Sequence, residues 1–182
     1  MNANDLQSVF DSYFKKAASS SQQLLGLEVE CFLLRPQSPH DTPVADPEFV
    51  LFQPLPMEGA VSIHKLLEAL AELPEWHEVW EYPLPEESVP SRLLGLKQEY
   101  GSSISVEPGG QFELSDAPRG ELQEIQSSLA QFHTSLNHVL HEWGGHTLHV
   151  GMQPWLTPDQ LPFFGKRRYQ VMYEHMPRVG GL

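Results

Sequence analysis

An apolar segment over residues 24–34 carries two glutamates, and it restricts the fold more than any other part of the chain. Its Leu- and Val-rich composition is typical of a β-strand. Because side chains alternate between the two faces of a strand, Glu28 and Glu30 share one face while Cys31 lies on the other. Two like charges on one face repel each other and lose hydration when buried. Taken alone, the segment is therefore a strand whose acidic face is exposed to solvent.

A second acidic segment surrounds the turn formed by Pro108-Gly109-Gly110. Glu107 ends the strand before this turn, and Gln111 and Glu113 share one face of the strand after it. A tight glycine turn can bring Glu107 back toward Glu113. Hard cations such as Mg²⁺ bind oxygen ligands, and a rigid sheet is a good support for such ligands. We therefore expect four carboxylates on strands of one sheet to converge: Glu28, Glu30, Glu107 and Glu113.

The remaining patterns predict an α+β fold, with a mainly antiparallel sheet and helices packed on one face. Apolar residues at helical spacing predict a helix capped by Asn4 or Asp5 and carrying Leu6 to Phe14, and another capped by Ser62 and stopped by Pro74. A long helix is predicted to begin after Pro118 and to end at Gly144-Gly145, and a short one over 168–175. Short strands are predicted over 49–52, 76–82, 93–99, 102–107, 111–114 and 146–153. Prolines between residues 36 and 56 predict an extended loop.

Composition limits the partners and the compartment of the chain. The 182 residues suffice for about one domain. With 11 Lys and Arg against 24 Asp and Glu, the net charge of −13 disfavours nucleic acids and anionic membranes as partners. Cys31 is the single cysteine, which fits a reducing compartment. Neither a secretory signal nor a run of about 18 apolar residues is present, so we expect a cytoplasmic protein.

Several longer strings resemble the glutamate-cysteine ligase family of the plant and proteobacterial type. The most specific is Glu-Pro-Gly-Gly-Gln-Phe-Glu-Leu-Ser over residues 107–115, and Gly-Leu-Glu-Val-Glu over 26–30 accompanies it. Gly-Met-Gln-Pro-Trp over 151–155 and Lys-Arg-Arg-Tyr over 166–169 are similar to further motifs of this family. Related actinobacterial ligases of ergothioneine synthesis share much of the pattern, so the superfamily is defined more closely than the amine substrate.

The resemblance implies a glutamine-synthetase-like carboxylate-amine ligase domain and an ATP-dependent reaction. In that reaction the γ-carboxylate of glutamate is phosphorylated, and the amine of cysteine displaces phosphate to form γ-glutamylcysteine, the first step of glutathione biosynthesis. By this resemblance Mg²⁺ or Mn²⁺ is the cofactor, held by Glu28, Glu30, Glu107 and Glu113, and the substrate-binding residues are Gln111, Lys166, Arg168 and Tyr169.

Chains of this family are well over twice as long as this one. We therefore expect residues 1–182 to be the N-terminal part of a single ligase domain, inactive alone, whose partners are glutamate, cysteine, ATP and the missing C-terminal part. Two alternatives stay open: a non-catalytic or degenerate ligase that acts as a metal-binding or partner-pairing module, and an unrelated metal-binding sheet protein.

Two other motifs are weaker. His141-Glu142 followed by His146 resembles a zinc-protease motif, but the second histidine is five residues away instead of four, and Gly144-Gly145 interrupts the helix. Glu107 and Glu113 could serve as the acid and nucleophile of a glycosidase, yet no aromatic platform for a sugar is identifiable. Cys31, on the apolar face of its strand, is expected to be a small hydrophobic residue without a catalytic role.

Overall fold

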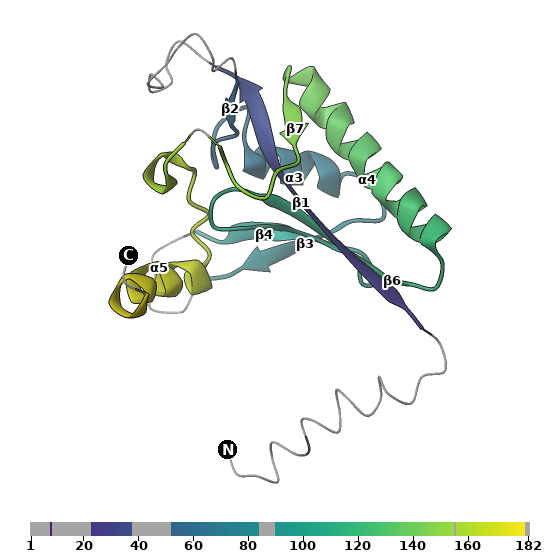
Figure 1. The fold of residues 1–182 in the computed structure, drawn as a ribbon. Helices are drawn as coiled ribbons and strands as arrows, with labels where there is room; N and C mark the ends of the chain where they lie inside the picture. The colour runs from purple at the N-terminus through teal and green to yellow at the C-terminus, as the bar shows by residue number, and fades with distance from the viewer. Residues whose placement is uncertain (1–7, 9–22, 38–51, 84–89, 155, 181–182) are drawn as a thin grey trace.

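A single antiparallel sheet forms the centre of the computed structural model, which describes residues 8, 23–37, 52–83, 90–154 and 156–180 (Figure 1). The strands are β1 (Leu25–Pro36), β2 (Phe52–Pro54), β3 (His77–Glu81), β4 (Arg92–Lys97), β5 (Ser103–Val106), β6 (Phe112–Arg119) and β7 (His146–Leu148). Within the described residues the sheet has 7 strands in the order β2-β1-β6-β5-β4-β3, and β7 also pairs with β1. The helices are α3 (Ile63–Ala71), α4 (Leu122–Glu142) and α5 (Arg167–Val179), with a 3₁₀ turn at Pro158–Gln160. The predicted α+β class is confirmed.

The strand β1 connects the two parts of the sheet. Its first half pairs with β6 from Leu25 to Cys31, and its second half pairs with β7 and β2. Cys31 and Leu33 belong to the hydrophobic core, whereas Glu28 and Glu30 are exposed. The predicted alternation is therefore present over residues 28–31, where one face of the sheet is polar, whereas further along β1 Phe32 and Leu34 are buried as well.

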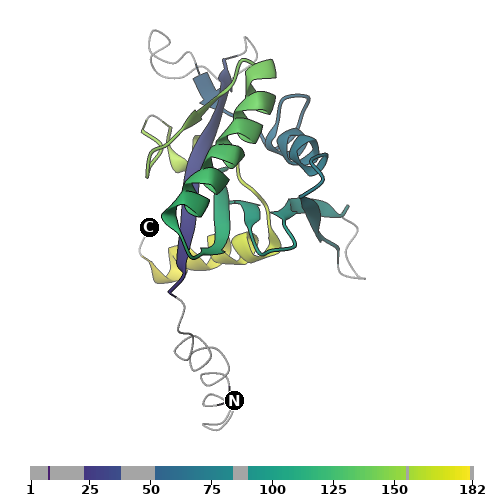
Figure 2. The ribbon, with the colours of Figure 1, turned by 90° about the vertical axis from the view of Figure 1, so that its right-hand side faces the viewer.

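Helices α3 and α4 cover the apolar face of the sheet (Figure 2). Ser62 caps α3 as predicted, because its Oγ accepts a hydrogen bond from the Lys65 amide at 3.2 Å. Leu66, Leu67 and Leu70 of α3 are buried against the sheet, and α4 buries Phe132, Leu136 and Leu140 at helical spacing. The short helix α5 lies away from this pair, at the other side of the sheet (Figure 2).

Three predicted elements end elsewhere than expected. The prediction that the C-terminal helix ends before Pro177 is wrong, because α5 continues to Val179. Pro177 has no N–H to donate to the Tyr173 carbonyl, yet the helix continues past it, and the Gly180 amide bonds to the Met176 carbonyl at 2.8 Å. β7 ends at Leu148 instead of residue 153, and β6 extends past residue 114 to Arg119. Pro118 is tolerated in β6 because the register with β1 shifts there.

Some predictions concern residues outside the described ranges. The predicted helix carrying Leu6 to Phe14 and most of the proline-rich loop between residues 36 and 56 fall there. Of the strand predicted over 49–52, only Phe52 is described, and it begins β2. No described helix is long and apolar enough to span a membrane.

The buried carboxylate of Asp116 ties β6 to its neighbours. It accepts hydrogen bonds from Ser102 at 2.8 Å and Ser128 at 2.9 Å, and from Arg119 at 3.0 and 3.2 Å. Its side chain is 0% exposed. Burial alone would raise the pKa of Asp116, but the hydrogen bonds from Arg119, Ser102 and Ser128 outweigh it and lower the pKa below its ordinary value. The network connects β6 to the loop before β5 and to α4.

Replacing Asp116 by Asn should lower the free energy of unfolding by about 2–3 kcal/mol, because bonds to a buried charged group are lost. Since folding lowers the pKa of Asp116, its contribution is complete above the unfolded-state value of about 3.9. That contribution is lost as the pH falls through the lower folded-state value. In urea unfolding, the difference between parent and Asp116→Asn should shrink below about pH 4. The exposed Asp159→Asn should show neither effect, and an equal loss in both variants would contradict this role.

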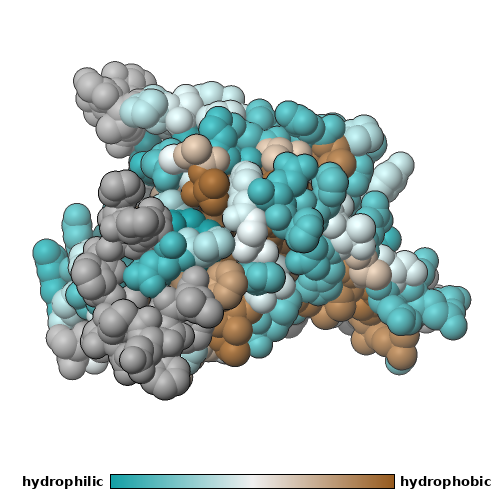
Figure 3. Space-filling model, turned by 90° about the horizontal axis from the view of Figure 1, so that it is seen from above, coloured by the Kyte–Doolittle hydropathy of each residue, from teal (hydrophilic) through white to brown (hydrophobic). Residues whose placement is uncertain are grey.

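Large apolar side chains are exposed along α5. Val171, Tyr173 and Val179 are 62%, 73% and 63% exposed, and Met172 and Met176 are also exposed. Seen from the end that carries β2 and β7, the visible surface is mainly hydrophilic with separate apolar patches (Figure 3). An apolar helix face of this kind is typical of an interface.

We expect the isolated chain to self-associate through α5. Replacing Met172 and Tyr173 by Lys should lower the average mass at high concentration, because charge disfavours burial of this face. Light scattering over a concentration series measures this, with Asn137→Lys on α4 as a control that adds charge at an exposed polar position. A parent chain that stays monomeric throughout would disprove the prediction.

Candidate active site

Cross-strand pairing brings the predicted acids to one face of the sheet. Glu30 on β1 lies directly opposite Glu113 on β6, and Glu28 lies opposite Ser115. Since directly opposed residues share a face, Glu28, Glu30 and Glu113 project to the side away from α3 and α4. The Ser115 hydroxyl donates a hydrogen bond to Glu113 Oε1 at 2.8 Å. The sheet itself therefore determines the spacing of three of the four predicted acids.

The glycine turn positions the fourth acid, Glu107. The Gly110 amide donates to the Glu107 carbonyl at 2.9 Å, and the Glu107 amide donates to the Gln111 carbonyl at 2.8 Å. Gly110 has a φ of 81°, which side-chain-bearing residues rarely adopt. The turn thereby reverses the chain directly after β5. Glu107 is close enough to Glu30 to influence its ionisation.

The acids affect one another electrostatically. Partial burial of the Glu30 carboxyl raises its pKa, and so do repulsion from Glu113 and Glu107, a hydrogen bond shared with the Glu113 side chain, and repulsion from Glu28. All four predicted acids thus appear in one electrostatic group. Among the described residues, no group of three or more His, Cys, Asp or Glu side chains is arranged so that it could hold a metal ion.

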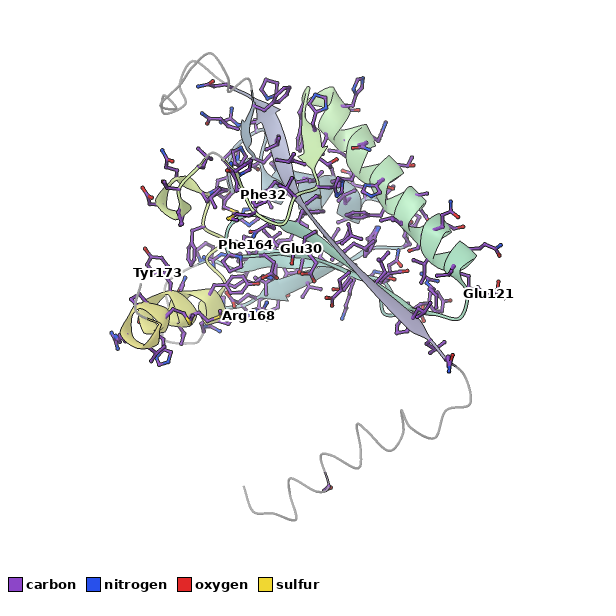
Figure 4. The ribbon with its side chains drawn as sticks, in the orientation of Figure 1. Glu30, Phe32, Glu121, Phe164, Arg168 and Tyr173 are labelled. Carbon is purple, nitrogen blue, oxygen red and sulfur yellow. The ribbon has the colours of Figure 1, made fainter. Side chains whose placement is uncertain are left out.

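The predicted cationic residues stand beside these acids. Lys166, just before α5, is 7% exposed, and its Nζ lies 5.1 Å from the centre of the Tyr169 ring. Burial lowers the pKa of Lys166, and so does repulsion from Arg168, whereas Glu107 and Glu113 act in the opposite direction. Figure 4 shows Glu30 on β1 and Arg168 on α5, near Phe164. Glu121, at the start of α4, lies at the opposite end of the molecule in the same view.

Tyr169 joins the cationic residues to the acids. Its hydroxyl accepts a hydrogen bond from Arg168 at 2.7 Å and donates one to Glu107 Oε1 at 2.9 Å. The Arg168 guanidinium also lies 4.7 Å from the centre of the Tyr169 ring and 3.8 Å from Glu107 Oε1. Burial raises the pKa of Tyr169. The hydrogen bond from Arg168 lowers it and the hydrogen bond to Glu107 raises it, so the net shift is upward. Tyr169 therefore stays a neutral donor that orients Glu107.

Gln111, the remaining predicted binding residue, lies at the glycine turn. Its Oε1 is buried without a hydrogen-bond partner, and a Cβ added at Gly109 would lie 2.8 Å from that oxygen. A buried acceptor of this kind is rare in proteins. The amide is thus held in the turn that also positions Glu107.

Two residues of this region were not predicted from the sequence. Glu81 on β3 accepts a hydrogen bond from the Arg167 amide at 3.3 Å, at the N-terminus of α5. Arg92 on β4 donates to the Gly165 carbonyl and lies 3.6 Å from Glu81. Both contacts are between distant parts of the chain, and no local pattern signals them. Together they hold the start of α5 against the polar face.

A hollow of about 410 Å³ lies over this face, between the strands and the start of α5. Its lining includes Glu81, Ser103, Ser105, Lys166 and Arg168. Gly95 forms part of the floor, and a Cβ there would overlap the Ile104 carbonyl oxygen. A second hollow of about 410 Å³ lies on the opposite, helical side, lined by α4 and the end of α3. The first is adjacent to the acids and is the one relevant to their chemistry.

Two weaker motifs can be settled from the same geometry. Cys31 is buried in the core, and burial raises the pKa of its thiol to about 12, so it is no thiolate nucleophile. His141 lies on α4 and His146 on β7, with Gly144 at a φ of 66° between them. The two histidines therefore do not share one helix as a zinc-protease motif requires.

The donor set fits a hard divalent cation. Glu28, Glu30, Glu107 and Glu113 supply only carboxylate oxygens, which Mg²⁺ and Mn²⁺ prefer. A bound cation would offset the mutual repulsion that raises the pKa of Glu30. Carboxylates cluster on one face of the antiparallel sheet, and cationic side chains lie next to them. The protein is therefore of the class of α+β domains with a charged site on an open sheet face.

Comparison with known proteins agrees with this class. The model of glutamate-cysteine ligase family 2 (GCS2) matches residues 24–182, and the chain belongs to this family. It is 38% identical over 120 residues to the chloroplastic glutamate–cysteine ligase of Arabidopsis thaliana, covering 66% of this chain and 21% of that protein. The Nicotiana tabacum enzyme is 36% identical over 135 residues, covering 74% and 24%. The chain thus spans about a fifth to a quarter of the length of these relatives.

If the acid cluster is complete in this chain, Mg²⁺ or Mn²⁺ should raise its melting temperature. At ten times the dissociation constant the gain is about 1.4 kcal/mol. Glu28→Gln combined with Glu113→Gln should abolish this rise, since two of the expected oxygen ligands lose their charge. Differential scanning fluorimetry measures it, with the exposed Glu142→Gln as the matched control. An unresponsive parent, or a double variant that responds like the parent, would count against the cluster.

Proposed function

We propose that this chain supplies part of the active site of a ligase that joins the γ-carboxylate of glutamate to the amine of cysteine at the expense of ATP. The observation that carries the proposal is that Glu30 pairs with Glu113 across two strands, while Glu107 contacts Tyr169 and Arg168 at the cationic start of α5. Membership in the glutamate-cysteine ligase family supports it. The chain covers only about a fifth to a quarter of these relatives, which supports a larger ligase domain, and in this proposal residues 1–182 are its N-terminal part.

The reaction needs two bond exchanges. A γ-carboxylate oxygen of glutamate attacks the terminal phosphorus of ATP, and the bond from this phosphorus to the ADP oxygen breaks. The amine of cysteine then attacks the acyl carbon, phosphate leaves with the electrons of the carbon–oxygen bond, and the nitrogen loses a proton. Both steps concentrate negative charge on phosphate oxygens, so they require nearby positive charge and fixed reactants.

The residues of this chain have distinct tasks in that scheme. Arg168 and Lys166 border the hollow and supply positive charge for a substrate carboxylate or phosphate. Tyr169 orients Glu107, and the sheet register orients Glu30 and Glu113. A divalent cation held by the four glutamates would neutralise phosphate charge. The location proposed from the sequence remains cytoplasmic, although the plant relatives are named as chloroplastic proteins.

In a polypeptide extended to the family's full length, phosphate release should require ATP, glutamate and cysteine together. Glu113→Gln should lower kcat/KM by about 100-fold or more, because changes behind a metal site alone typically cost roughly 10–100-fold. A coupled phosphate assay measures both effects, and Glu142→Gln at the exposed end of α4 should keep parental activity. Phosphate release without glutamate would refute the proposed reaction. Full activity with an amine other than cysteine would instead correct the substrate.

A further inference from the structure

Two histidines contact each other away from the acidic face. His133 lies on α4 and His149 directly follows β7, and the centres of their rings are 5.0 Å apart with the planes at 72°. His133 is half-buried beside the Phe132 ring, at 5.5 Å between centres, whereas His149 is exposed. None of the functions described above uses this pair.

The backbone around the pair is held by short-range structure. The Gly145 amide donates to the Leu140 carbonyl at 2.8 Å, and Gly144 takes a positive φ of 66°, so α4 turns directly into β7. β7 is in turn anchored on β1, where Thr147 lies opposite Leu33. His133 and His149 are therefore presented by two elements that cannot separate freely. Such support is what a preorganised ligand pair requires.

The chemistry of the pair differs from that of the acid cluster. A neutral imidazole has one nitrogen lone pair, and it prefers Zn²⁺, Cu²⁺ or Ni²⁺ to Mg²⁺. Burial, and then repulsion from His149, lowers the pKa of His133, so its ring is neutral near pH 7. A neutral ring can bind a metal without first losing a proton.

We propose that His133 and His149 form a two-imidazole site for a borderline transition metal ion such as Zn²⁺, separate from the acid cluster, with water completing the coordination. Because no described group of three His, Cys, Asp or Glu residues accompanies the pair, two protein ligands hold the ion. Binding is thus weaker than at a four-ligand structural zinc site.

Occupation of the site would link α4 to the segment that follows β7. That segment leads within a few residues to Gln153, whose buried side chain accepts a hydrogen bond from the Leu156 amide at 2.8 Å. A metal bridge at His149 therefore restrains the start of the stretch that carries the Gly-Met-Gln-Pro motif. The expected consequence is local stiffening without any change at Glu30 or Glu113.

The test uses the 182-residue chain with isotope-labelled histidines, titrated with ZnCl₂ in excess Mg²⁺. In NMR spectra two of the 9 histidine ring signals should shift together, and they should be the signals missing from His133→Gln and His149→Gln. Zn²⁺ should also raise the melting temperature of the parent, and each of these variants should lose that rise. His149 is exposed, so His149→Gln decides the matter if His133→Gln fails to fold.

Two controls separate this site from other ligands. His138 and His141 are exposed on the same helix, so His138→Gln with His141→Gln should leave the Zn²⁺ response intact. Glu28→Gln with Glu113→Gln should leave it intact as well, whatever becomes of the proposed ligase reaction. A response that survives in His149→Gln, or that disappears in either control, overturns the two-histidine site.

Discussion

The pairing of β1 with β6 is the constraint on which the rest of the structure depends. It places Cys31 opposite Phe112 and Glu30 opposite Glu113, and the alternation of side chains then separates core from polar face. A shift of one residue would exchange the two faces and bury the glutamates against α4. The hydrophobic core therefore enforces the same register that assembles the acids.

Hydrogen bonds within the chain partly offset the electrostatic repulsion among the clustered acids. Ser115 donates to Glu113 and Tyr169 donates to Glu107, so two of the carboxylates have fixed partners. Burial raises the pKa of Glu30, and repulsion from its acidic neighbours raises it further. A site of this kind favours the arrival of a cation, since each added positive charge relieves repulsion that folding has already imposed.

Sequence patterns were most informative where the signal is local. The alternation in residues 24–34, the cap at Ser62 and the spacing of Phe132, Leu136 and Leu140 predicted β1, α3 and α4. The end of α5 was missed because proline was expected to stop the helix, whereas α5 continues two residues past Pro177. Glu81 and Arg92 were missed because their partners lie more than 70 positions away along the chain, at Arg167 and Gly165. Long-range contacts of single residues leave no periodic signal.

The sequence by itself determined which residues are acidic, the approximate positions of most described strands and helices, and which family the motifs resemble, since these follow from residue type and local spacing. Only the tertiary structure decided that Glu30 faces Glu113, that Tyr169 connects Arg168 to Glu107, and that His133 meets His149. The physical reason is that strand register and helix docking arise from burial summed over the whole core. A short stretch of sequence does not specify how much surface the whole core buries.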